Sequence, residues 1–138
     1  MIYRREGQIR RLERLKEYVH DLKEIKVDSF EEYLKDKKTR YSVERLLFLI
    51  AQGILDFLDH ILSSRHQVVS DTYEEILENA YKHDVISKEL YSKLKGLGSF
   101  RNILAHEYLR ISDEEIFRNY QKMLEIMDEV IEEFEETL

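Results

Sequence analysis

Four side chains suited to phosphate chemistry gather in one short segment, FRNILAHEYL, residues 100–109. They are Arg101, Asn102, His106 and Tyr108. Because histidine has an unperturbed pKa of about 6.5, His106 can take or give a proton near neutral pH. Arg101 stays charged and offers a planar fork of N–H groups to phosphate oxygens. The set suits RNA cleavage by attack of a 2′-hydroxyl on the adjacent phosphate, which needs proton transfer and charge stabilisation but no metal.

The spacing of these residues sets a geometric requirement. On an ideal helix Asn102 lies one turn before His106 on the same face, where it can orient the imidazole or touch RNA. Arg101 and His106 are five positions apart, which separates them by about 140° around the helix axis. For both to act on one phosphate, the helix must bend, the arginine must reach across, or a second copy of the chain must supply one of the two groups.

The composition predicts that helices position this segment. The 138 residues include no proline and four glycines, and 43% of them are hydrophobic. Such a composition is typical of long helices and is sufficient for one hydrophobic core. We therefore expect a single all-α domain over residues 1–138.

Hydrophobic periodicity and capping residues locate the helices. Apolar residues at steps of three and four predict long helices over 9–25, 41–62, 87–106 and 112–134. Capping boxes that begin at Ser29, Thr72 and Ser112 mark three helix starts, two of them for shorter helices near 30–34 and 72–80. Residues 35–40 and 63–70 are interpreted as exposed connections. The predicted architecture is an antiparallel bundle of four long helices with a short additional helix.

Two glycines interrupt the predicted 87–106 helix. Gly96 and Gly98 each cost about 1 kcal/mol relative to alanine in a helix interior. Their presence suggests that another backbone approaches closely at this point.

The most apolar helix, 41–62, carries a narrow polar stripe. Arg45, Gln52, Asp56 and Asp59 are spaced seven, four and three positions apart, which keeps them on one side. Polar groups on a central helix need partners or a cavity. Arg45, Gln52 and Asp56 are therefore candidates to line a cleft, whereas Asp56 and His60 are interpreted as a polar contact within the bundle and not as a metal site.

Several function classes lack support in the sequence. The absence of cysteine excludes disulfides, thiolate metal ligands and cysteine nucleophiles. No apolar run approaches the roughly 18 residues of a membrane span, so we expect a soluble cytoplasmic protein without membrane association. His106-Glu107 begins like a zincin motif, but Arg110 stands where the second histidine belongs. No phosphate-binding glycine loop is present, and we expect no metal and no cofactor.

The charge is unevenly distributed. The net charge of −7 argues against a uniform nucleic-acid-binding surface. However, residues 4–16 carry six basic side chains against two acidic ones, and residues 113–136 carry ten acidic side chains against two basic ones. A local basic surface could therefore hold RNA, although charged runs are often solvated faces or pairs across a bundle.

The arrangement of Arg101, four residues, His106, one residue and Tyr108 resembles the signature of the HepT group of HEPN toxins. The similarity includes the preceding GLGSF, the Asn102 after the arginine, the SDEE start of the last helix and the central YSVERLL…IAQGILDFLDHI, and so covers nearly the whole chain. The resemblance implies a HEPN-like helical domain that acts as a metal-independent RNA endonuclease, the ribonuclease toxin of a type II toxin–antitoxin system. It implies that Arg101 and His106 are catalytic.

Further expectations follow from the same resemblance. Asn102, Arg45, Gln52 and Asp56 would support the catalytic pair. The partners would be the RNA substrate, a minimal nucleotidyltransferase antitoxin and a second copy of the chain, with the two-fold axis near FRNILAHEYL where the glycines permit close approach. The nucleotidyltransferase would silence the toxin by transferring AMP to Tyr108.

Other interpretations remain open at this point. The chain could be a non-catalytic helical partner that binds a nucleotidyltransferase and a nucleotide, or a purely structural bundle. Arg101 and His106 could form a capping or salt-bridged pair near a helix end, and Tyr108 could be an ordinary half-buried aromatic residue. The presence of both Arg101 and His106 favours the nuclease. A purely structural bundle would not explain why Arg101, Asn102 and His106 cluster.

Overall fold

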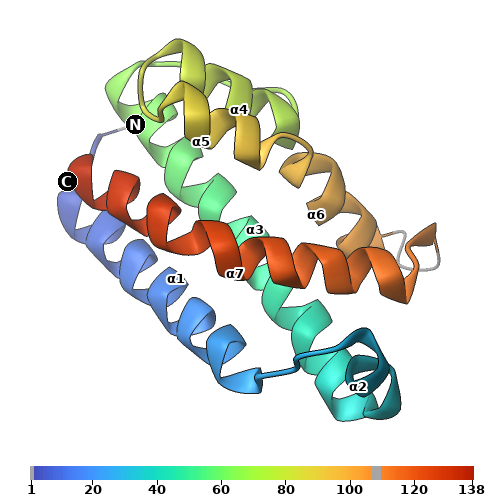
Figure 1. Ribbon diagram of the computed structural model, residues 1–138. Coiled ribbons are helices and arrows are strands. Elements are labelled where there is room, and N and C mark those ends of the chain that lie inside the picture. Colours follow the sequence, from blue (N-terminus) through green and yellow to red (C-terminus); the bar gives the residue numbers. More distant parts are fainter. Residues whose placement is uncertain (1, 107–109) are drawn as a thin grey trace.

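The chain folds as an all-α bundle in the computed structural model, which describes residues 2–106 and 110–138 (Figure 1). Seven helices and no strand occur among these residues. Their bounds are α1 Arg5–Ile25, α2 Phe30–Lys35, α3 Lys37–Arg65, α4 Tyr73–Lys82, α5 Lys88–Leu94, α6 Leu97–His106 and α7 Asp113–Glu136. The predicted all-α fold class is confirmed for the described residues.

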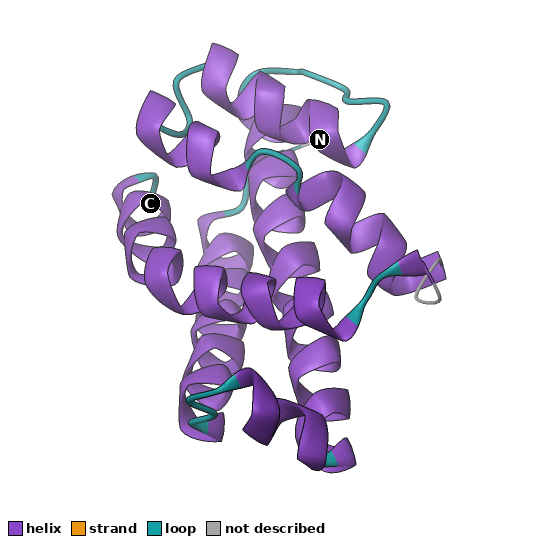
Figure 2. Cartoon of the chain, turned by 45° about the vertical axis from the view of Figure 1, so that its right-hand side comes forward, coloured by secondary structure: helices purple, strands orange, loops and turns teal. Residues whose placement is uncertain are grey.

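The three longest helices form the body of the bundle. In Figure 1, α1 and α7 lie side by side, with α2 at one end and α4 and α5 at the other. Seen after a 45° turn in Figure 2, the helices are joined by short connections. The two ends of the described chain lie together, and Arg5 Nε donates a hydrogen bond of 3.1 Å to the carbonyl oxygen of Leu138.

The central position predicted for the most apolar helix is confirmed. α3 packs against α1, α2, α4, α6 and α7. Phe57 is fully buried on α3 and stacks on Phe134 of α7 with ring centroids 4.3 Å apart. Among the described residues, α3 is the one helix long and apolar enough to span a membrane, a property that the core helices of globular bundles share.

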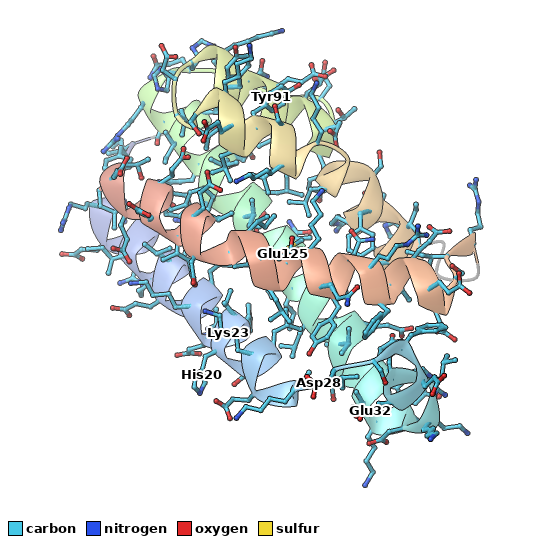
Figure 3. The ribbon with its side chains drawn as sticks, in the orientation of Figure 1. His20, Lys23, Asp28, Glu32, Tyr91 and Glu125 are labelled. Carbon is cyan, nitrogen blue, oxygen red and sulfur yellow. The ribbon has the colours of Figure 1, made fainter. Side chains whose placement is uncertain are left out.

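The predicted capping boxes form at the helix starts. Ser29, Thr72 and Ser112 each accept a hydrogen bond from the backbone N–H three residues later, at 3.2, 3.1 and 3.2 Å. Glu32 accepts a hydrogen bond of 3.4 Å from the backbone N–H of Asp28, the residue before the cap, and Figure 3 labels both residues at the start of α2. Local side-chain chemistry therefore fixes where these helices begin.

The exposed corner expected at residues 35–40 is present but shorter than predicted. Only Asp36 leaves the helical conformation, at φ −118° and ψ 109°, and α3 already begins at Lys37. The Asp36 carboxylate caps α3 by accepting from the Lys38 backbone and the Thr39 hydroxyl, each at 3.0 Å, and these bonds lower its pKa. α3 also continues to Arg65, so the first residues of the expected 63–70 connection are helical.

The expected continuous helix over residues 87–106 is divided. α5 ends at Leu94, Lys95 lies in a turn at φ −54° and ψ 133°, and Gly96 adopts φ +90° before α6 begins at Leu97. Residues that carry a Cβ rarely adopt this backbone conformation, which explains why glycine occupies the position. The carboxylate of Glu74 on α4 then caps α6, because its two oxygens accept from the backbone N–H groups of Gly96 and Gly98 at 2.9 Å each.

The close backbone approach expected at the glycines occurs at Gly98, inside the chain. A Cβ atom built on Gly98 would lie 2.5 Å from the backbone nitrogen of Glu74 and 2.8 Å from the carbonyl carbon of Tyr73. Gly98 is buried against α4 and therefore does not serve the dimer contact assigned to it from the sequence. Its role is to set α6 directly on α4, which places the Arg101 backbone.

Candidate functional site

Arg101 is held between three helices. Its Nε donates a hydrogen bond of 2.6 Å to Oε1 of Gln52 on α3. Its guanidinium carbon lies 4.4 Å from the ring centroid of Tyr73 on α4 and 5.3 Å from that of Phe48 on α3. Cation–π contacts of this kind stabilise a guanidinium without neutralising its charge. Arg101 is thus a fixed cation at the α3–α6 boundary.

The polar stripe predicted on α3 supports this arginine. Nε2 of Gln52 donates a hydrogen bond of 2.8 Å to Oδ1 of Asp56. Because Gln52 accepts from Arg101 and donates to Asp56, its amide has one assigned orientation, with the oxygen toward the arginine. Asp56, Gln52 and Arg101 therefore form a hydrogen-bonded chain from α3 to α6, and the supporting role of Gln52 and Asp56 stays a prediction.

The remaining polar residues of this helix face a different environment. Burial raises the pKa of Asp59, and the neighbouring Asp56 carboxylate raises it further. His60 lies against Tyr3, with ring centroids 5.9 Å apart, and burial followed by the charge of Arg11 lowers its pKa. The contact expected between Asp56 and His60 gives way to the bond between Asp56 and Gln52.

A hollow of about 550 Å³ lies between α3 and α6. Arg101 and His106 both line it, together with Arg45 from α3. α6 continues without interruption from Leu97 to His106, so the separation of about 140° around its axis holds, and both residues nevertheless line the same hollow. The sequence-predicted pair therefore shares one space without a bend in the helix.

The hollow contains two arginine side chains around one aromatic ring. The guanidinium carbon of Arg45 lies 5.5 Å from the Phe48 centroid, and that of Arg101 lies 5.3 Å from the same centroid. Arg45 and His106 are exposed to solvent, whereas Arg101 is half-buried. Two positive groups beside an accessible imidazole form an arrangement that can receive a phosphate diester.

The two other members of the motif have different outcomes. Asn102 is exposed, and its Oδ1 accepts a hydrogen bond of 3.1 Å from Arg101. The sequence had placed it beside His106, but the bond observed serves the arginine instead. Tyr108, the expected site of AMP transfer, lies outside the described residues.

Sequence reasoning missed several residues that shape the hollow. Phe48 and Tyr73 provide the rings beside Arg101, and Glu44 is a half-buried acid in the hollow wall. Burial raises the pKa of Glu44, Asp113 raises it further, and Arg40 opposes the change. Phe48 could have been found from the sequence, since it lies between Arg45 and Gln52 on the same side of α3.

Comparison with known proteins places these features in context. The family model described as Ribonuclease HepT-like matches residues 12–134. A protein of Aphanizomenon flos-aquae (strain 2012/KM1/D3) named tRNA nuclease HepT is 34% identical over 107 residues, which cover 78% of this chain and 73% of that protein.

Two solved structures share the fold. A tri-AMPylated HEPN toxin of Shewanella oneidensis in complex with MNT antitoxin superposes with a TM-score of 0.80 at 18% identity. A toxin–antitoxin complex with AMP-PNP superposes with a TM-score of 0.81 at 17% identity. Each alignment covers 93% of this chain and 96% of the other.

Proposed function

The chain belongs to the HepT-like ribonuclease family, and from that premise we propose that it is a metal-independent RNA endonuclease, the toxin of a toxin–antitoxin pair. One observation carries the proposal: Arg101 and His106 line the same hollow, with Arg45 opposite them on α3. The named relative from Aphanizomenon flos-aquae makes transfer RNA the first substrate to test. Because transfer RNA is found in the cytoplasm, we expect the protein to act there.

The proposed reaction is an internal transfer at one phosphate. A general base removes the proton of the 2′-hydroxyl, the 2′-oxygen bonds to phosphorus, and the bond from phosphorus to the 5′-oxygen breaks. A general acid gives a proton to the leaving 5′-oxygen, so the products are a 2′,3′-cyclic phosphate and a 5′-hydroxyl. His106 serves proton transfer, and Arg101 stabilises the charge that develops on the phosphate oxygens.

The reaction calls for both a base and an acid, which motivates a homodimer. Each chain contributes one His106, and two chains related by a two-fold axis near α6 would bring two copies of the motif to a shared cleft. Multi-angle light scattering at micromolar concentration should give a mass close to twice the 16.8 kDa of one chain. A mass of a single chain under these conditions would contradict the shared cleft.

The defining experiment is cleavage of labelled transfer RNA by the purified protein in excess EDTA. We expect activity to persist, since side chains supply both proton transfer and charge stabilisation, and we expect products that end in cyclic or 3′-phosphate. Activity that disappears with the chelator and returns with magnesium would reject the mechanism. Binding to a nucleotidyltransferase without any RNA cleavage would instead favour the non-catalytic alternative.

We further propose that a partner nucleotidyltransferase controls this activity by transferring AMP to Tyr108. The support is the resemblance of the Arg101, His106 and Tyr108 spacing to the family motif, together with the AMPylated state of the Shewanella oneidensis toxin. Added AMP brings bulk and negative phosphate charge to the motif, which would compete with RNA for Arg101.

Mass spectrometry tests this control. After incubation with the cognate nucleotidyltransferase, ATP and magnesium, the intact mass should rise by one or more AMP units and peptide mapping should place the modification on Tyr108. Tyr108→Phe should escape neutralisation by this route. An unmodified Tyr108 in a fully inhibited complex would show that inhibition works by another means.

A further inference from the structure

A second hollow borders the candidate site on the other side of α3. It has a volume of about 540 Å³ and lies between α1 and α3. Arg10, Arg11 and Arg14 line it from α1, with Asp56 as its acidic member from α3. We call this hollow the arginine groove. Three arginines against one aspartate give the groove an excess of positive charge.

The basic residues of α1 divide into two groups. Lys16 and Lys23 form ion pairs with Glu135 and Asp128 of α7, at 2.7 and 2.8 Å, and Figure 3 labels Lys23 on α1. The three arginines of the groove form no ion pair with α7 within the described chain. The lysines therefore belong to the packing of α1 on α7, and the arginines do not.

The arginine side chains remain available to a ligand. Arg14 is 67% exposed, lies 3.9 Å from the 72% exposed Glu17, and interacts with the Tyr18 hydroxyl, which raises the pKa of the arginine. Arg11 donates to Oε1 of Gln8 at 3.1 Å, a neutral partner that leaves its charge in place. Arg10 is exposed and forms no ion pair with any described carboxylate.

The arginine groove is continuous with the candidate site. Gln52 lines the groove, and its Oε1 accepts the 2.6 Å hydrogen bond from Arg101, which lines the other hollow. Along α3, the distance from Arg45 to Asp56 is about 16 Å at a rise of 1.5 Å per residue. That length corresponds to roughly five stacked nucleotides at about 3.4 Å each.

The lining of the groove suits a single RNA strand. Guanidinium groups bind phosphate oxygens, and the half-buried Leu49 and the ring of Tyr18 offer apolar surface for bases. We propose that the arginine groove binds the RNA backbone flanking the phosphate that is cut at the Arg101–His106 hollow. This inference rests on the proposed nuclease function and assigns to it a substrate-binding surface, with Arg10 and Arg14 as phosphate contacts.

Binding of a fluorescent single-stranded RNA 12-mer, followed by anisotropy in a His106→Ala background that prevents cleavage, tests the groove. The Arg10→Gln/Arg14→Gln variant should bind roughly tenfold more weakly at about 50 mM salt, because two phosphate contacts are lost. The slope of log K against log salt should decrease by about 1.4, since each contact to a single strand contributes about 0.7. Arg10→Lys/Arg14→Lys should recover most of the slope.

A matched control removes the same charge from the other face of the helix. Lys16→Gln/Lys23→Gln changes the net charge equally but lies outside the groove, so its affinity should stay within about twofold of the parent and its salt slope should be unchanged. Equal effects of the arginine and lysine variants would overturn the proposal. So would loss of nucleotidyltransferase binding with RNA affinity unchanged, which would assign the groove to a protein partner.

Kinetics separates the groove from the nuclease itself. With His106 intact, Arg10→Gln/Arg14→Gln should raise KM roughly tenfold and leave kcat nearly unchanged, as expected for lost uniform binding. An unchanged KM alongside normal cleavage would reject the groove while the nuclease stands. Arginine-dependent RNA binding without cleavage by any variant would reject the nuclease and support the groove.

Discussion

Replacing His106 by alanine should lower the rate of RNA cleavage by about a hundredfold to ten-thousandfold, the usual contribution of a general acid or base. Arg101→Ala should lower it by about a hundredfold to a thousandfold, because the developing phosphate charge loses its fixed cation. Both losses should appear in kcat, since the two residues line the hollow that we propose receives the reacting phosphate. Cleavage of labelled transfer RNA in EDTA measures them.

Controls for this experiment come from the same chain. His20→Ala removes an exposed histidine on α1, and Arg118→Ala removes an exposed arginine on α7, so both should retain full activity. The Arg101→Ala/His106→Ala double variant should lose little more than the worse single variant, because the pair acts as a unit. Full cleavage by His106→Ala would exclude this site as the source of the activity.

Gly98→Ala should destabilise the fold strongly for so small a change. The added Cβ would lie 2.5 Å from the backbone nitrogen of Glu74, and a backbone cannot move aside as a flexible side chain can. We expect a loss of about 2 to 3 kcal/mol in the free energy of unfolding, within the range for overpacked sites. For a domain of this size that corresponds to a decrease in Tm of roughly 10 °C. Calorimetry or chemical denaturation measures both quantities.

Gly53→Ala is the matched control for the steric argument. A Cβ on Gly53 would meet only Cδ1 of Leu15, at 3.2 Å, which is the end of a flexible side chain. Alanine also gains about 1 kcal/mol of helix propensity over glycine. Gly53→Ala should therefore be nearly neutral or slightly stabilising, and a Gly98→Ala protein as stable as Gly53→Ala would refute the close contact between α4 and α6.

Much of the fold could be predicted because its signals are local. The spacing of apolar residues identified α1, α3 and α7, and the Ser or Thr caps marked the starts of α2, α4 and α7. The errors occurred where one residue changed the backbone. Asp36 shortened an expected corner to a single extended residue, and Gly96 divided an expected helix through its positive φ.

The candidate site was predictable only in part. Arg101 and His106 stood out by residue type and spacing, and the polar stripe of α3 identified Gln52 as a supporting residue. The ring of Tyr73 beside Arg101 and the cap that Glu74 provides for α6 depend on how α4 meets α6. That contact is possible because Gly98 has no side chain. A single sequence shows that the glycine is there but does not show which distant backbone packs against it.

The division of charge on α1 also bears on how the protein meets a polyanion in solution. Two lysines of α1 are neutralised by α7, whose residues 113–136 carry ten acids against two bases, while the arginines face the groove beside α3. The charge of the molecule is therefore unevenly distributed over its surface, despite the net charge of −7. An approaching strand is repelled by the acidic side and attracted by the other, so the field rotates the protein before contact. The polyanion therefore meets the protein mainly at its basic side. The rate of this encounter decreases as added salt shortens the range of the field.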